Sequence, residues 1–195
     1  MKRRMGVLVI GLLLLLTLAC GGGGTASGVQ IEVVNRTPED VCYVYISEID
    51  SDTWGDDQLG GEETIVPGKS QTFDFPAGEY DVRLENCDEV AMANRWMISR
   101  STKITIGESG ATSWVMLDNS TGGDVCYVFI SSSTGDDWGD DRMGENEAIP
   151  AGEQRMFYMK PGTYDLQALD CDENVLAEEY EVDLSIGRPW ELSGN

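Results

Sequence analysis

The chain has 195 residues, of which 35 are acidic, 13 are basic and none is histidine, so its net charge is −22 at neutral pH. This charge argues against nucleic acid as a partner, because phosphate binding needs clustered lysine and arginine. Without histidine, the chain has no imidazole for base catalysis or for metal ligation. Hydrophobic residues make up 41% and charged residues 25% of the chain, values typical of a folded protein rather than a disordered one.

The N-terminal residues have the organisation of an export signal. Lys2, Arg3 and Arg4 precede an apolar run over residues 5–19. A run of about fifteen residues is too short for a membrane span of roughly 20 residues, but it is typical of the apolar region of a signal peptide. We therefore predict a signal peptide at residues 1–19.

The end of this run is LTLAC at residues 16–20, and four glycines follow it. This segment resembles the lipobox of bacterial lipoproteins. The resemblance implies that Cys20 becomes the first residue of the mature chain and carries diacylglycerol and palmitate. Residues 20–28 would then form the lipidated cysteine and a flexible tether. An ordinary cleaved signal, in which Cys20 is incidental, and an uncleaved membrane anchor are the alternatives.

Signal removal before Cys20 would leave a mature charge of −25, because 13 basic residues become 10 against 35 acidic ones. Such a chain is repelled by anionic lipid headgroups. We therefore expect an exported protein whose membrane contact is its lipid anchor alone, in the cell membrane or the outer membrane.

The chain matches itself when it is shifted by 84 residues. From Asn35 to Glu89, 25 of 55 positions are identical to the later copy, without a gap. A period of this length indicates two tandem domains rather than a solenoid. We place the first domain at residues 29–110 and the second at residues 111–195.

Short runs rich in β-branched and aromatic residues alternate with glycine and proline turns in both copies. We predict strands at 29–34, 41–47, 64–66, 70–75, 79–85, 90–98 and 102–106, repeated about 84 residues later. Seven short strands per copy predict an all-β fold, with two tandem small antiparallel β-sandwich or barrel-like domains.

Four cysteines remain after Cys20, two at matching positions in each copy. In an exported chain, an even count at repeated spacing indicates disulfides. The repeat favours the pairs Cys42–Cys87 and Cys126–Cys171 among the three connectivities. Each would close a loop of about 45 residues and stabilise its domain by roughly 4 kcal/mol.

The candidate functional residues lie in an acidic loop of each copy, at residues 48–63 and 132–147. The first loop has seven carboxylates and no basic residue, and the second has six carboxylates and one arginine. The tryptophans and aspartates retained in both loops are Asp52, Trp54, Asp56, Asp57, Asp136, Trp138, Asp140 and Asp141.

Three interpretations of these loops remain open. In the first, the carboxylates bind Ca²⁺, although Trp54 stands where an EF-hand loop has its third ligand. In the second, Trp54 and Trp138 stack on sugar rings, and two copies give avidity. In the third, which we favour, both tryptophans are buried plugs, while the aspartates form solvated turns.

The repeated pattern YV[YF]IS, WGDD and GxYD resembles small exported β domains of bacterial surface proteins, a resemblance that implies no activity. We expect an acidic, lipid-anchored, non-enzymatic envelope protein with an interaction or structural role. We predict no catalytic residue and no cofactor, unless the loops bind Ca²⁺. The partner besides the membrane would be a protein or a glycan.

Overall fold

A computed structural model describes residues 28–144 and 146–194. The predicted signal peptide at residues 1–19, the lipidation site Cys20 and most of the tether lie outside these residues. In the part of the chain that the structure describes, no helix has the length and apolar character needed to cross a bilayer.

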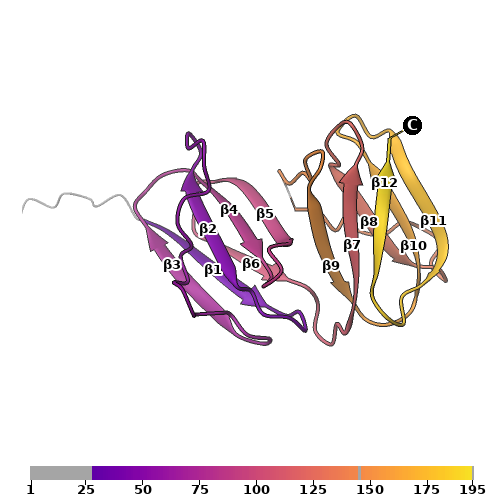
Figure 1. Ribbon diagram of the computed structural model, residues 1–195, viewed down its shortest axis with the longest axis horizontal. Coiled ribbons are helices and arrows are strands. Elements are labelled where there is room, and N and C mark those ends of the chain that lie inside the picture. The colour runs from indigo at the N-terminus through magenta and orange to yellow at the C-terminus, as the bar shows by residue number, and fades with distance from the viewer. Residues whose placement is uncertain (1–27, 145, 195) are drawn as a thin grey trace, which may run out of the picture.

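The described residues form twelve β-strands, which confirms the predicted all-β fold. In chain order they are β1 (Val29–Asn35), β2 (Tyr43–Glu48), β3 (Ser70–Phe75), β4 (Tyr80–Glu85), β5 (Ala91–Ile98), β6 (Thr102–Ile106), β7 (Ser113–Ser120), β8 (Tyr127–Ser132), β9 (Gln154–Met159), β10 (Thr163–Leu169), β11 (Val175–Asp183) and β12 (Arg188–Ser193). Figure 1 shows β1–β6 and β7–β12 as two β bodies side by side.

Both halves use the same strand plan. In the first half, β3-β1-β6 and β2-β4-β5 are the two layers, and in the second half they are β9-β7-β12 and β8-β10-β11. β1 pairs antiparallel with β3 and parallel with β6, and β7 does the same with β9 and β12. The layers containing β1 and β7 are therefore mixed, whereas we predicted antiparallel sheets.

The predicted strand at residues 64–66 is a single bridge, in which Ile65 pairs with Val41. Pro67 follows directly and lacks the N–H that a ladder needs, and Gly68 has a φ of 77°. These two residues end the pairing in the first half. In the second half, Ile149 forms the same single bridge, with Val125, and Pro150 and Gly152 follow it, so each half has six strands rather than seven.

The core of each half lies between its two layers, because alternate residues of the strands point inward. In β1 the inward residues are Val29, Ile31 and Val33, each at most 3% exposed. They belong to one cluster with residues of β2 and β4. In the second half, Trp190 of β12 is likewise buried in the core between the layers and is 1% exposed.

One six-stranded sheet runs through both halves, in the order β12-β7-β9-β5-β4-β2. The two halves meet where β5 faces β9 (Figure 1). These strands run parallel, and Ala91 pairs with Arg155. Met156 and Tyr158 of β9 belong to the first core rather than the second. The joint therefore combines edge pairing with burial of apolar surface.

A buried carboxylate completes the joint. The Glu147 side chain is 0% exposed and forms ion pairs with Arg155, which is 6% exposed, and Arg95. Its Oε1 accepts the backbone N–H of Asn94 in β5 at 2.9 Å, and its other oxygen accepts the N–H of Gly144. The Glu147 carboxylate thus accepts a β5 backbone N–H in the way that the carbonyl of a neighbouring strand would. Burial lowers the pKa of Arg155, and the Glu147 charge opposes this shift.

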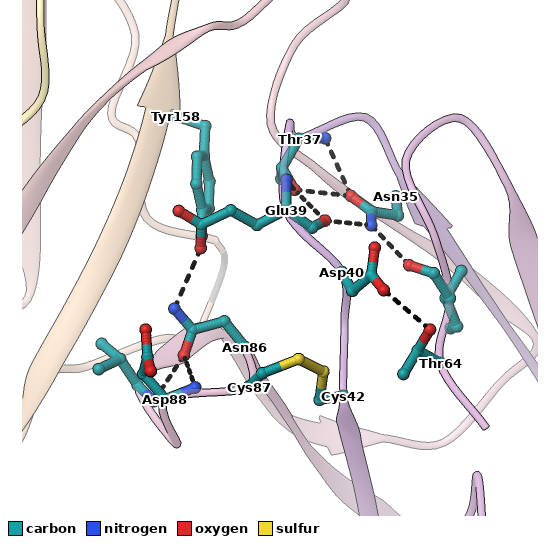
Figure 2. The surroundings of a disulfide bond; sticks show 12 residues. Asn35, Thr37, Glu39, Asp40, Cys42, Thr64, Asn86, Cys87, Asp88 and Tyr158 are labelled. Atoms are coloured by element: carbon teal, nitrogen blue, oxygen red, sulfur yellow. Dashed lines mark hydrogen bonds between the residues drawn. A yellow bond between two sulfur atoms is a disulfide. The ribbon is translucent and has the colours of Figure 1, made fainter. Parts of the chain in front are cut away.

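A second contact across the joint lies beside the first disulfide (Figure 2). The Glu39 carboxylate accepts hydrogen bonds from the Tyr158 hydroxyl at 2.8 Å and from Asn86 Nδ2 at 3.1 Å. Cys42 and Cys87 are bonded to each other and link the segments that carry these two residues of the first half. The disulfide therefore holds together the surface on which β9 rests.

The counterparts of β9 and β5 are β3 and β11, and each is paired on one side only among the described strands. They do not carry the side chains of the joint. The 84-residue shift relates Arg155, Tyr158, Glu39 and Arg95 of the joint to Gln71, Asp74, Gly123 and Glu179. Three of these counterparts lie on the outer strands β3 and β11, and Gly123 lies between β7 and β8.

We expect Glu147→Gln to lower the free energy of unfolding by about 3–5 kcal/mol, because it leaves the Arg155 guanidinium buried without its charge partner. Urea unfolding of the two-domain chain measures this change. The matched control is Glu63→Gln, since Glu63 is the exposed repeat counterpart of Glu147 and should cost less than about 0.5 kcal/mol. Equal costs for the two variants would show that the buried carboxylate does not stabilise the joint.

Candidate functional site

The acidic loops are anchored by one aspartate each. Asp57 Oδ1 accepts the backbone N–H of Val44 in β2 at 2.9 Å and that of Leu59 at 3.1 Å. Asp141 makes the same two bonds, with the N–H groups of Val128 and Met143, at 2.9 and 3.0 Å. These half-buried aspartates form the predicted Asx-type turns, but they also tie the loop to the neighbouring strand. Burial raises the pKa of Asp141, and its backbone donors oppose this shift.

The apolar plug of each loop is not its tryptophan. Leu59 and Met143 are 4% and 7% exposed and lie in the two cores. Trp54 and Trp138 are only partly buried. The predicted role of the tryptophans as buried plugs is therefore wrong. The Asx turns explain the difference, because they direct the residue two positions after the aspartate into the core.

Each loop tryptophan contacts a second aromatic ring that sequence reasoning missed. Trp54 packs against Trp96 of β5, with ring centroids 5.2 Å apart, and Trp138 packs against Tyr180 of β11 at 5.7 Å. The partners are themselves related by the 84-residue shift. The sequence did hold a signal for these partners. Position 96 and its counterpart, position 180, are both aromatic, but they lie just beyond the segment in which the two repeats are clearly identical.

A β-bulge orients the second ring. The pairing of β4 with β5 shifts register between Tyr80 and Val82, and Met97 has a φ of 57°. Asp81 Oδ1 accepts the N–H of Met97 at 2.9 Å and holds the bulge. In the second half, Asp165 binds the N–H of Glu181 in the same way, at 2.8 Å. A bulge re-aims the neighbouring side chain, here the aromatic residue that precedes the bulged position.

In the first half, the ring pair borders an open recess of about 210 Å³. We call it the tryptophan recess, and its lining residues are Ser47, Ser51, Asp52, Thr53, Trp54, Asp81 and Trp96. Asp52 is an exposed residue of this lining, and its counterpart Asp136 in the second loop is also exposed. Asp56 and Asp140 are exposed but are not part of the recess lining or of the aspartate anchors.

The second ring pair also lies among carboxylates. Tyr180 is 60% exposed and donates a hydrogen bond to Glu178 at 3.0 Å. This bond raises the pKa of the Tyr180 phenol, and the negative charge of Asp165 raises it further. The same combination of two rings and carboxylates therefore occurs in both halves.

The described residues 28–144 and 146–194 bring together no cluster of metal ligands. No group of three or more aspartate, glutamate or cysteine side chains converges there to hold a metal ion. Calcium binding by the loops stays a prediction that only a titration tests.

A second cavity, of about 160 Å³, lies at the joint between the two halves. Arg95, Arg142 and Arg155 line it together with apolar residues such as Met92 and Phe157. The Arg155 Nε is buried and has no hydrogen-bond partner in the described part of the chain. The cavity has room for water, the ordinary partner of such a donor.

No protein-family model and no curated protein matches this chain. Among solved structures, it is similar to the Bacillus anthracis TIE protein, with 10% identity and a TM-score of 0.27. The match covers 86% of this chain and 34% of that structure, so the chain spans about a third of its length. A likeness of this degree shows neither a shared family nor a shared function.

We expect Leu59→Ala to destabilise the chain by about 2–5 kcal/mol, because it removes a buried side chain and leaves a cavity. Trp54→Ala should cost only about 1 kcal/mol, since its ring is partly exposed and packs mainly on Trp96. Urea unfolding ranks the two variants, and exposed Gln58→Ala is the baseline. A larger cost for Trp54→Ala would restore the tryptophan as the plug.

We expect Asp57→Ala to cost about 1–3 kcal/mol, because the backbone N–H groups of Val44 and Leu59 lose their acceptor. Asp57→Asn retains an acceptor oxygen and should cost less. Asp56→Ala removes the same charge from the next residue and should stay within about 0.5 kcal/mol of the native chain. Equal unfolding midpoints for the two alanine variants would show that the Asp57 bonds contribute no stability.

Proposed function

We propose that this protein is an exported, lipid-anchored and non-enzymatic envelope protein with an interaction role. Cys20 carries the lipid, residues 20–28 form the tether, and the two sandwiches are presented beyond the membrane surface. The chain works without a cofactor, and its partner is a protein or a glycan.

The repeated disulfide is the observation that carries this proposal. Cys42–Cys87 and Cys126–Cys171 are bonded at the same place in each half, with a sequence separation of 45 in both. Such bonds indicate an oxidising, extracellular environment. An export signal that ends in a lipobox-like segment agrees with that environment and supplies the means of attachment.

The placement of the loop carboxylates supports binding rather than catalysis. Asp57 and Asp141 are committed to backbone hydrogen bonds, and Asp56 and Asp140 are exposed. Hydrolysis by two carboxylates needs a pair that faces a bound substrate at a set separation. The first aromatic pair, by contrast, lies beside the exposed carboxylate of Asp52, an arrangement suited to recognition.

We expect Cys20→Ser to release the chain from the membrane fraction or to stop signal removal, because serine has no thiol for lipid attachment. Cell fractionation and mass spectrometry of the N-terminal peptide measure the two effects. Cys42→Ser is the matched control, since it removes a different cysteine and should leave attachment unchanged. Normal processing and membrane attachment of Cys20→Ser would contradict the proposal.

A further inference from the structure

We infer that the tryptophan recess binds the guanidinium group of an arginine side chain presented by a protein partner. This inference rests on the proposed interaction role and names the chemistry that the partner supplies. It also applies to the equivalent surface around Trp138 and Tyr180 in the second half.

The rings favour a weakly hydrated, planar cation. The ring centroids of Trp54 and Trp96 lie 5.2 Å apart at an interplanar angle of 34°, so the two rings pack against each other, and both line the recess. A guanidinium group stacks on aromatic faces and is less strongly hydrated than an ammonium group. Tryptophan is the best aromatic partner for such a cation.

The opposite charge and the hydrogen-bond acceptors lie in the same recess. Asp52 and Asp81 both line it, and the loop that carries Asp52 has no basic residue in positions 48–63. Ser47, Ser51 and Thr53, which carry hydroxyl groups, complete the lining. A guanidinium has five N–H donors in a fixed fork, which these carboxylates and hydroxyls can accept. A quaternary ammonium has no N–H to offer them.

The second half repeats the arrangement with different residues. Trp138 and Tyr180 replace the tryptophan pair, and Asp136 and Asp165 are the counterparts of the two recess aspartates. The bulge that orients the ring is held in the same way in both halves. Two sites on one rigidly joined chain fit a partner with more than one arginine, because linked sites gain from effective concentration.

The test is an NMR titration of the two-domain chain with N-acetyl-arginine amide, following the indole N–H signals. The signals of Trp54, Trp96 and Trp138 should shift, whereas those of Trp114 and buried Trp190 should not. N-acetyl-citrulline amide has nearly the same shape without the charge and should bind at least about tenfold more weakly. N-acetyl-lysine amide should be weaker than arginine, and added salt should weaken arginine binding.

Two matched variants locate the site. Asp52→Asn removes a recess carboxylate and should weaken arginine binding to the first half by about three- to tenfold. Asp56→Asn removes an equally exposed charge from the same loop and should change the affinity less than about twofold. Neither aspartate side chain has a hydrogen bond to the backbone among the described residues, so both variants should fold.

Equal binding of arginine and citrulline, or equal effects of the two variants, would overturn the inference. Shifts of the same signals by methyl β-glucoside but not by arginine would assign the recess to a sugar instead. Shifts with Ca²⁺ alone would assign the loop to a metal. Membrane attachment through Cys20 is measured separately, so an anchored chain that binds no arginine would overturn this inference and leave the anchor proposal intact.

Discussion

The two-domain body depends on one buried carboxylate. Glu147 is removed from water, which is costly for a charge unless strong partners surround it. Its partners come from both halves, Arg155 and Gly144 from the second and Arg95 and Asn94 from the first. The ion pair with Arg95 and the bond from the Asn94 N–H therefore form only when the halves are docked. This requirement selects one relative placement of the two sandwiches.

That placement also determines which surfaces are left for binding. The joint covers the edge of β5 near its start, whereas Trp96 and the bulge lie near its end, beside the loop after β2. The tryptophan recess is therefore open although it shares a strand with the joint. In the second half, β11 is an outer strand, and Tyr180 is correspondingly more exposed.

The sequence predicted the fold well and the site only in part. The strands and the disulfide pairs follow from local alternation and from the repeat, both of which can be read along the chain. The plug was assigned to Trp54 instead of Leu59 because residue size says little about which side chain a turn directs inward. Trp96 was missed because a bulge sets its orientation. The Glu147 contacts could not be predicted because they join residues of two repeats. Comparing one repeat with the other shows which positions are equivalent, but it does not show which residues touch.

The joint is head-to-tail, because different strands of the two repeats meet there. β5 of the first repeat pairs with β9 of the second, and β9 is the counterpart of β3. A contact of this kind does not close on itself, and if every repeat kept it, copies of the chain could add end to end into open filaments. The outer edges lack the required partners, since Gln71 and Glu179 stand where the joint has two arginines. Carboxylates along β11, including Glu178 and Glu181, further discourage strand addition. The divergence of the two repeats therefore has a consequence for solubility: it removes from the outer edges the side chains through which further copies of the chain would add by the same contact.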